Sequence, residues 1–547
     1  MLDFKSCLRS LREIVRPSLG RITVTVLIGV VRVAASLCFV AVCKELVDIA
    51  TGCSDGALVP HIWMMVGVMT LQLVSNIAFS YWQNITTVKT QNDIRHKKFS
   101  YVMHTVWDGH DSFHSADAVN RLEEDVRVVV DLVCVRFPDV IITLVQLLAA
   151  SVYLMTKAPN LGWILIILMV CAVVGSKMFF KKIRALTAEI RELDSRVQGI
   201  MQESLQYRIL VMTLGATEKV LGRLGYTQDE LVDKTYKRLD LNAVARGFMS
   251  FGFMAGYFAA FIWGVLGISK GAVTYGTMTM LLQLVGQVQR PIADLSRHVP
   301  AFIHALTSVD RLEEITMIEL EEDGPDCIVP GAPEVRVSDV TFSYPAAPEN
   351  VLEHFSFNFV GGGITAIMGP TGQGKSTLMR LVLALLKPVS GEIALVSGDE
   401  SVPVSPETRC NFMYVPQGNS LMSGTIRDNL RLASSAATEE QMRHALHVAE
   451  ADFVMDLPDG LDTVCSEKGG GLSEGQAQRI CIARALLHDG GILILDEATS
   501  SIDAGTESRL LANLVSEYKG RKTILFVTHR EAVLSYSDAI LRLGDDK

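Results

Sequence analysis

The run from Gly369 to Thr377 has the residue types and the spacing of a phosphate-binding loop, G-x4-G-K-S. Glycines in such a loop let backbone N–H groups turn toward an anion. Lys375 is then placed to reach the outer phosphates of a nucleotide, and the Ser376 hydroxyl to bind magnesium. The predicted nucleotide contacts in this loop are Gly369, Pro370, Thr371, Gly372, Gln373, Gly374, Lys375, Ser376 and Thr377.

Two carboxylates end a second apolar run. The residues from Gly491 to Leu495 read as a strand, and Asp496 and Glu497 follow it directly. Asp496 at a strand end suits contact with magnesium, and Glu497 beside it could hold and polarise an attacking water. The phosphate loop itself follows an apolar strand, Ile364 to Met368, and precedes a helical pattern, as a functional loop requires. Together these features predict nucleotide hydrolysis.

Gln417 and His529 also stand at the ends of strand-like runs, Tyr414-Val-Pro-Gln417 and Thr523 to Thr528. Either residue alone would be an ordinary structural residue. Their order around the phosphate loop and the two carboxylates makes both of them candidates for the same site. A further motif, Leu472-Ser-Glu-Gly-Gln476, lies between them in the sequence.

The elements that must position these residues fall into two halves of different composition. The chain has 547 residues, 49% of them hydrophobic, with a mean hydropathy of +0.30, and its long apolar stretches lie in the first half. The net charge of −10 gives no sign of a nucleic-acid partner. The ten cysteines include no C-x-x-C pair, so neither a disulfide framework nor a cysteine zinc site is expected.

Six stretches of predominantly apolar residues are long enough to predict membrane spans. Basic residues lie beside the two long links, after spans two and four, so these links and both termini are expected in the cytoplasm. The links are charged and helical in period, which predicts long hairpins that need a partner to pack on. A basic amphipathic start, with Lys5, Arg9, Arg12 and Arg16, predicts an interfacial helix. The spans run approximately from Ile22 to Val47, Ile62 to Trp82, Leu132 to Met155, Leu161 to Phe180, Phe248 to Ile268 and Met278 to Val299.

A polar linker rich in proline and glycine, from Glu321 to Pro333, separates the apolar half from short β-like runs that begin at Val335. We therefore expect a multidomain membrane protein. Residues 1–318 would form an all-α transmembrane domain with the interfacial helix, six spans and two cytoplasmic hairpins. Residues 319–547 would form an α/β P-loop nucleotide-hydrolase domain.

Polar groups inside the spans are the direct evidence on a transported molecule. Arg32 lies near the middle of the first span, where a lone cation costs about 2.5–3.5 kcal/mol on insertion scales. Two interpretations stay open. The polar groups could line a water-filled, partly cationic cavity for an amphiphile that carries negative charge, or they could form hydrogen bonds and ion pairs between helices. The candidate cavity residues are Arg32, Gln72, Asn76, Gln283, Gln287 and Arg290.

With these motifs in this order, essentially the whole chain resembles an ATP-binding-cassette (ABC) exporter half-transporter of the type IV kind. The resemblance implies that Tyr344 stacks on adenine, and that Gln417 contacts magnesium and senses the membrane domain. It implies that the signature Leu472–Gln476 contacts a γ-phosphate bound by the opposite subunit, and that residues 501–503 couple the two sites. His529 would be the switch histidine. Coupling helices are implied near residues 108–118 and 206–214.

The resemblance implies ATP and Mg2+ as cofactors. The signature and the coupling loop would add Ser473, Gly475, Gln476 and Asp503 to the nucleotide contacts. The catalytic residues would be Glu497, His529, Lys375 and Gln417. The metal contacts would be Ser376, Gln417 and Asp496. Glu474 departs from the family pattern, in which this signature position is most often glycine. We expect its side chain to point away from the nucleotide, because Ser473 and the backbone make the phosphate contact.

The expected function is ATP-hydrolysis-driven export, or lipid translocation, of an amphiphilic substrate by alternating access in a dimer of half-transporters. A homodimer is favoured because Glu497 and the signature are intact. A subunit of a heterodimeric exporter and an ATP-gated regulatory protein that does not pump are the alternatives. The expected partners are membrane lipid, a second half-transporter and a small, anionic amphiphile, with no nucleic acid. By resemblance, the location is a bacterial inner membrane with the nucleotide-binding domain in the cytoplasm.

Overall fold

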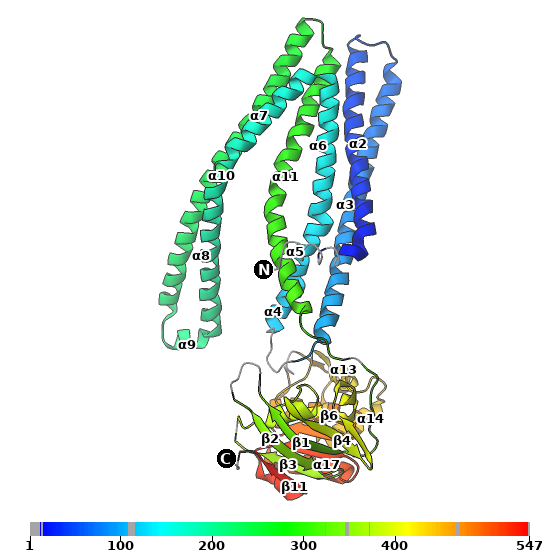
Figure 1. Ribbon diagram of the computed structural model, residues 1–547, viewed down its shortest axis with the longest axis vertical. Helices are drawn as coiled ribbons and strands as arrows, with labels where there is room; N and C mark the ends of the chain where they lie inside the picture. The colour runs from blue at the N-terminus through cyan, green and yellow to red at the C-terminus, as the bar shows by residue number, and fades with distance from the viewer. Residues whose placement is uncertain are drawn as a thin grey trace. The chain divides into compact units, whose positions relative to one another are not determined.

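The computed structural model describes residues 11, 15–107, 115–322, 324–344, 349–370, 372–466 and 471–544. The chain divides into two compact units. Met1–Phe99 and Val119–Ile315 form the first unit, and Ser100–Ala118 and Thr316–Lys547 form the second. The first unit is built from long helices, and the second contains the β-sheets (Figure 1).

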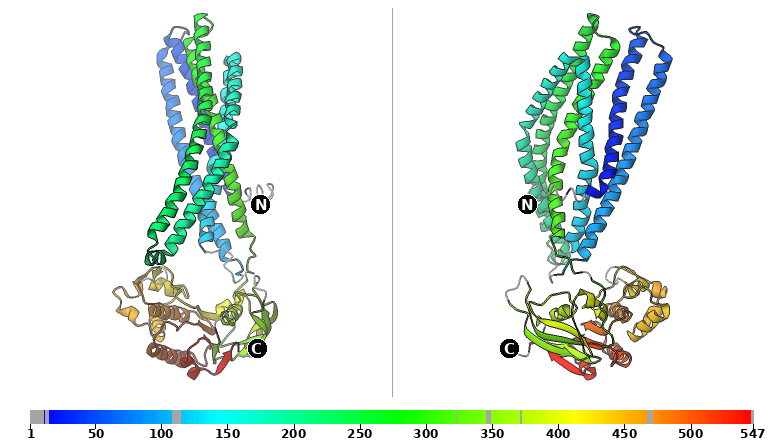
Figure 2. Two further views of the ribbon diagram at one scale, coloured as in Figure 1. Left: turned by 90° about the vertical axis from the view of Figure 1, so that its left-hand side faces the viewer. Right: turned by 45° about the vertical axis from the view of Figure 1, so that its right-hand side comes forward.

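Long helices run side by side through the first unit (Figures 1 and 2). α2 packs along α6, and α10 packs along both α7 and α8. α3 and α10 continue well past the predicted spans and reach 46 and 53 residues. Their polar extensions form the helical hairpins that the charged links predict. The segments are η1 (Arg16–Ser18), α2 (Leu19–Ala50), α3 (Leu58–Met103), α4 (Ser115–Asn120), η2 (Arg121–Asp125), α5 (Val126–Val130), η3 (Asp131–Arg136), α6 (Phe137–Lys157), α7 (Pro159–Lys177), α8 (Phe180–Gln206), α9 (Arg208–Thr213), α10 (Thr217–Ser269) and α11 (Tyr275–Thr316).

The predicted spans fall on α2, α3, α6, α7, α10 and α11, except that the third begins in η3 and the fourth runs past the end of α7 at Lys177. By length and composition alone, three helices in the described ranges can cross a membrane: Arg16–Ala50, Leu58–Met103 and Thr217–Ser269. The helices of the first unit pack closely against one another in its interior. A Cβ on Gly29 of α2 would lie only 2.1 Å from Ile142 Cδ1 of α6, so the glycine lets the two helices approach.

A short helix, α9, joins α8 and α10 within the region 206–214 that the resemblance assigns to a coupling helix. Ile209, Leu210 and Met212 on this helix are all exposed. In both views of Figure 2, α8 and α10 form an antiparallel pair with α9 at its end. Most of the other expected coupling region, residues 108–114, lies outside the described residues, as do Lys5, Arg9 and Arg12.

Two main sheets form the frame of the second unit. The strand order is β11-β3-β10-β9-β6 in a parallel sheet and β2-β1-β4-β5 in an antiparallel one, and β7 and β8 form a separate pair. The strands are β1 (Glu334–Phe342), β2 (Leu352–Phe359), β3 (Ile364–Met368), β4 (Ser390–Ser397), β5 (Glu400–Pro403), β6 (Phe412–Val415), β7 (Gly424–Thr425), β8 (Val464–Cys465), β9 (Ile492–Asp496), β10 (Thr523–Val527) and β11 (Ala539–Arg542). The helical segments are α12 (Lys375–Val382), η4 (Pro406–Asn411), α13 (Ile426–Arg431), α14 (Glu439–Val448), α15 (Phe453–Asp456), η5 (Gly460–Asp462), α16 (Glu474–Leu486), α17 (Ala504–Tyr518) and η7 (Glu531–Tyr536).

The parallel sheet is buried on both faces, which explains why its strands are continuous apolar runs. In β9, Leu493 and Leu495 join a core cluster with α13, α14, α16 and α17. The alternate residues Ile492 and Ile494 join a second cluster that contains α12 and the antiparallel sheet. Because successive side chains of a strand point to opposite faces, this alternation fixes the sheet between two layers. The polar residues that follow the strands are thereby held at its edge.

Candidate active site

Parallel strands bring the motif residues to one edge of the sheet. The phosphate loop follows β3, Gln417 comes after β6, Glu497 follows β9 and His529 comes after β10. The carboxyl ends of parallel strands meet at the same edge, so residues far apart in the sequence become neighbours. The arrangement explains why each motif lies just after an apolar run.

Glu497 is held from two sides. Gln417 Nε2 donates a hydrogen bond to its Oε2 at 2.5 Å, and His529 Nε2 lies 3.1 Å from its Oε1. The backbone of Glu497 has a φ of +49°, and its N–H donates to Val527 O at 2.9 Å. A residue with a side chain in this left-handed region carries strain of about 1–3 kcal/mol, which the surrounding structure must offset. The structure thus gathers Gln417, Glu497 and His529 into one cluster.

The phosphate loop turns through glycines with positive φ. Gly372 and Gly374 have φ values of +88° and +84°, and Gly374 is the N-cap of α12. Lys375 Nζ donates to Gly369 O at 2.6 Å and to Pro370 O at 2.9 Å. Burial lowers the pKa of Lys375, and the charges of Glu497 and Asp496 act in the opposite direction. Thr371, another predicted contact, lies outside the described residues.

Asp496 is buried, with an exposed fraction of only 3%. The Ser376 hydroxyl lies near its carboxylate and opposes the rise of its pKa, and the Tyr414 phenol is another neighbour of the carboxylate. Among the residues that the structure describes, Asp496 Oδ1 has no hydrogen-bond partner. Burial raises the pKa of Asp496, and the neighbouring charge of Glu497 adds to this effect. Burial also raises the pKa of Tyr414 to about 12.

This donor set fits a hard divalent cation. A buried carboxylate oxygen without a partner is costly, and a bound cation would satisfy it. The Ser376 hydroxyl lies beside it, and the Gln417 amide belongs to the neighbouring Glu497 cluster. Oxygen ligands of these types are those that Mg2+ prefers.

Tyr344, the adenine contact that the resemblance implies, lies next to the phosphate loop. Its hydroxyl shares a hydrogen bond of 3.1 Å with Thr377 Oγ1, and its ring packs edge-on against Phe342 at 5.0 Å. Arg380 donates to the same phenol oxygen at 3.2 Å. The sequence prediction missed Arg380, although its place one turn after Ser376 on a helix that begins at the loop could have pointed to it.

The signature begins helix α16. Ser473 is its N-cap, and the Ser473 and Gln476 side chains each accept a hydrogen bond from the other's backbone N–H. A cavity of about 320 Å³ opens beside them. Its lining comprises Ser473, Glu474, Gly475, Arg479, Ser501, Ile502 and Asp503. Among the described residues of the phosphate loop, none lines it. Glu474 is exposed and shares this cavity with Ser473.

The loop Ser501–Asp503 packs tightly against the signature helix. A Cβ on Gly475 would lie 2.7 Å from Ser501 O, so a glycine is required there. Gln478, also missed in the sequence, is buried and accepts a hydrogen bond from Ser501 N at 3.2 Å. Asp503 ends the loop by capping α17, where it accepts from Thr506 N at 3.0 Å.

Arg530 holds the same loop from the other side. It donates to Ser500 O at 2.7 Å, to Ile502 O at 2.9 Å and to Glu507 at 2.6 Å. The sequence prediction stopped at His529 and missed its neighbour. The one feature of the sequence that could have pointed to Arg530 is its position next to His529, because an arginine after a strand forms no distinctive motif.

In the first unit, several of the predicted cavity residues gather around the middle of α2. Gln72 Nε2 donates to Ala35 O at 3.3 Å, and Gln287 Nε2 donates to Ser36 Oγ at 2.9 Å. The Arg32 guanidinium lies over the Phe79 ring, 4.4 Å from its centroid. Gln72 and Gln287 therefore make the hydrogen bonds between helices that one interpretation predicts. Of the rest of the set, Gln283 is half-buried, and Asn76 and Arg290 are exposed.

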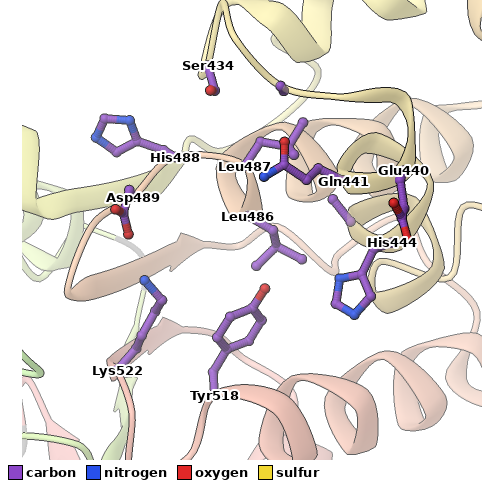
Figure 3. A pocket seen from close by; sticks show the side chains of 12 residues that line it. Ser434, Glu440, Gln441, His444, Leu486, Leu487, His488, Asp489, Tyr518 and Lys522 are labelled. Carbon is purple, nitrogen blue, oxygen red and sulfur yellow. The ribbon is translucent and has the colours of Figure 1, made fainter.

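A larger cavity, of about 690 Å³, lies elsewhere in the second unit (Figure 3). It lies between α14, the end of α16 and α17, and side chains such as His444, Tyr518 and Lys522 line it. Lys522 Nζ donates to Gly490 O at its edge. None of the predicted nucleotide contacts belongs to its lining, so cavity size does not locate the nucleotide site here.

The chain is also similar to known proteins over most of its length. The profile of the ABC transporter transmembrane region matches residues 22–292, and the ABC transporter profile matches residues 352–500. The chain is 27% identical to the ATP-dependent lipid A-core flippase of Vibrio cholerae, over 94% of this chain and 88% of that protein. It is 30% identical to the uncharacterized ABC transporter ATP-binding protein y4gM of Sinorhizobium fredii, over 84% of this chain and 80% of that protein.

The solved structure of a bacterial Atm1-family ABC exporter with ATP bound has the same fold, with a TM-score of 0.75 at 22% identity. The match covers 97% of this chain and 95% of that one. The helical membrane region and the nucleotide-binding region are therefore both present, in the same order. This chain belongs to the ABC transporter family, with its membrane-spanning and ATP-binding regions in one polypeptide.

Proposed function

We propose that the chain is a half-transporter that hydrolyses ATP to drive the export, or the movement between leaflets, of an amphiphilic molecule. The observation that carries the proposal is the position of Glu497. Its carboxylate stands at the end of β9 between Gln417 and His529, at the edge of the sheet that also carries the phosphate loop. A carboxylate in this place can position a water for in-line attack on the γ-phosphate.

The roles proposed for the other residues are those that the family resemblance implies, and their positions support them. Tyr344 stacks on adenine, and Lys375 leaves the carbonyls of Gly369 and Pro370 to contact the outer phosphates. His529 binds the phosphoryl group that is transferred. Ser376, Asp496 and Gln417 would hold Mg2+, which neutralises charge on the phosphates when it is bound.

We propose that two chains complete each site. The cavity of the signature is lined by residues 473–475, 479 and 501–503 and by no described residue of the phosphate loop, which supports a site shared between chains. A homodimer is favoured because this chain retains both Glu497 and the signature. The exposed apolar side chains of α9 support the same proposal, because a short apolar helix at the end of a long hairpin calls for a covering surface.

The proposed cycle is alternating access. Two ATP molecules would bind between the nucleotide-binding domains of a dimer, residues 319–547 of each chain, and hold them together. Closure would be passed to the membrane domains, residues 1–318, and hydrolysis would reset them. The basic residues of the long links support a cytoplasmic position for both termini and for the nucleotide-binding domain. We place the protein in a bacterial inner membrane.

The proposed cargo is an amphiphile that carries negative charge. The relative in Vibrio cholerae is a lipid A-core flippase, and cationic and amide side chains lie within the predicted spans of this chain. Since Gln72 and Gln287 already bond to α2, the cargo contacts proposed here are Asn76, Gln283 and Arg290, with Arg32 as a charge held against Phe79.

The test is ATP hydrolysis by the full chain alone in lipid nanodiscs, beside Glu497→Gln. Activity that this substitution abolishes, with ATP binding retained, is the expected result. Discs that contain one intact and one substituted chain test coupling between the two sites: independent sites would lose half of the activity per disc, and coupled sites would lose more. If the intact chain binds ATP and does not hydrolyse it, the homodimer proposal fails and a partner half-transporter must be sought.

The cargo is tested on the active protein. Anionic amphiphiles are expected to raise the hydrolysis rate, and Arg290→Gln is expected to reduce this stimulation while the basal rate stays. Stimulation by neutral and anionic amphiphiles alike would contradict the proposed charge preference.

A further inference from the structure

The residues at the end of α3 belong to the nucleotide-binding unit. Thr105 pairs with Leu320 as an antiparallel bridge. Val106 N donates to Glu319 O at 2.9 Å, and Glu321 N donates to His104 O at the same distance. The segment that leaves the first long hairpin helix is therefore joined to the linker by backbone hydrogen bonds.

This linker is tied in turn to the helix of the phosphate loop. Glu321 accepts two hydrogen bonds from Arg409, both at 2.7 Å. Arg409 also donates to Leu383 O at 3.1 Å and to Ala384 O at 2.5 Å, the carbonyls that follow α12. A bidentate pair of this kind is strong and has a fixed geometry. It holds the C-terminal end of α12.

A second connection reaches the other end of α12 through Trp107. The indole is half-buried and joins the core cluster that contains α12. The Arg380 guanidinium lies over it, 4.9 Å from the ring centroid, as in a cation–π interaction. Arg380 donates to the Tyr344 phenol oxygen at 3.2 Å, and that oxygen is 3.1 Å from Thr377 Oγ1. Indole, guanidinium, phenol and loop hydroxyl thus form a continuous row.

We propose that Trp107 is a positioning residue for ATP binding, which acts by holding Arg380 so that Arg380 holds the phenol of Tyr344 against the phosphate loop. The inference rests on the proposed role of Tyr344 as the adenine contact. A tyrosine can stack on adenine only if its ring is held beside the phosphate loop in the orientation that faces the adenine ring. Arginine has a long, flexible side chain, and the indole face limits its freedom.

Two substitutions distinguish a positioning role of Trp107 from simple apolar packing. Leucine at position 107 would preserve most of the buried apolar volume and would lose the attraction for the guanidinium. Phenylalanine would keep an aromatic face and so most of that attraction. The two substitutions therefore separate apolar packing from the contact with Arg380.

The first experiment uses tryptophan emission from the full chain in nanodiscs. Of the five tryptophans, Trp107 alone lies in the nucleotide-binding unit, and the others are Trp63, Trp82, Trp163 and Trp263. Closure of the dimer would also move the other four tryptophans, so the readout uses a variant in which these four are phenylalanine. We expect ATP to change the emission of Trp107 in this variant, and unchanged emission would overturn the proposal.

The second experiment measures affinity and rate separately. Trp107→Leu is expected to raise the KM for ATP by about 3- to 30-fold, the range of a cation–π contact. Its kcat should stay within about twofold of the intact chain, because the Glu497 cluster is untouched. Trp107→Phe should restore most of the KM. Loss of kcat with unchanged KM, or equal defects in the leucine and phenylalanine variants, would contradict a positioning role.

A double-substitution cycle on the dissociation constant for ATP tests the link through Arg380. Once Arg380→Met has removed the cation, Trp107→Leu should have little further effect. Fully additive effects would show that the indole does not act through the guanidinium. Binding is measured by displacement of a fluorescent ATP analogue, so this cycle is decisive even if the chain alone proves inactive. An active chain with unaltered ATP affinity in Trp107→Leu would overturn this inference and leave the proposed function standing.

Discussion

Removal of the Arg530 side chain should destabilise the nucleotide-binding unit and slow hydrolysis. Glu507 has only 2% of its side chain exposed, and Arg530 has 34%. Glu507 Oε1 has no hydrogen-bond partner in the described part of the chain, so Arg530 is the group that compensates the buried carboxylate. The same guanidinium holds the loop carbonyls of Ser500 and Ile502. Arg530→Met would leave all of these acceptors without their donor.

The expected loss can be sized from these contacts. Breaking a buried ion pair by removing one partner costs about 3–5 kcal/mol. Arg530 is partly exposed, so water can reach the site and the lower end, about 3 kcal/mol, applies. For a unit of this size, about 1 kcal/mol shifts the unfolding temperature by about 2–4 °C, so the predicted shift is about 6–12 °C.

Thermal unfolding of the full chain in nanodiscs, followed by circular dichroism at one scan rate, measures this shift. The matched control is Arg530→Met with Glu507→Leu, which removes both charges and should recover most of the stability. It should not recover kcat, because the loop at 501–503 still lacks its anchor. An Arg530→Met protein that unfolds within about 2 °C of the parent would refute the reasoning. So would a double variant less stable than either single one.

Two further predictions concern the signature and the metal site. Gly475→Ala should reduce kcat at least about tenfold while ATP binding to the phosphate loop stays, because the new Cβ would lie 2.7 Å from Ser501 O; steady-state hydrolysis and nucleotide binding check it. Asp496→Asn should stabilise the nucleotide-free protein at neutral pH. Burial makes the pKa of Asp496 higher in the folded state than in the unfolded state. The folded state therefore holds the proton of this carboxyl group more tightly, and the contribution of Asp496 to stability falls as the pH rises from the unfolded pKa through the folded pKa. Unfolding temperatures across pH 5–8 should show this gain for Asp496→Asn, together with the loss of the added stabilisation by ATP with Mg2+; an aspartate-like response of the variant would contradict the prediction.

The strands that carry the chemistry could be predicted almost to the residue. The apolar run Ile364–Met368 is β3, and the predicted strand before Asp496 is β9, displaced by a single residue at each end. Both are buried on two faces, so apolar composition alone marks them. The span predicted from Phe248 to Ile268 lies on α10, which begins at Thr217 and therefore also contains part of the charged helical link that was predicted before the span.

The residues that hold the site in place could not be predicted in the same way. Gln478, Arg530 and Arg380 act through hydrogen bonds to the loop after β9 and to Tyr344. Each contact depends on the tertiary arrangement of elements that are distant in the sequence, and no local pattern reports it. That Glu497 and His529 lie together could be predicted, because the order of the motifs carries information that a single residue at a strand end does not.

The hydrogen bonds from Lys375 to its own loop have a consequence for selectivity. The ammonium group donates to carbonyl oxygens of the loop, and these hydrogen bonds hold the loop in its turned conformation before a nucleotide binds. A weakly binding anion must displace two carbonyl oxygens from the lysine, and it offers few contacts in return. A nucleotide offers adenine, several phosphates and a metal ion at once, so it can complete this exchange with a net gain. These two hydrogen bonds of Lys375 thus compete with simple anions for the ammonium group and favour a nucleotide over them.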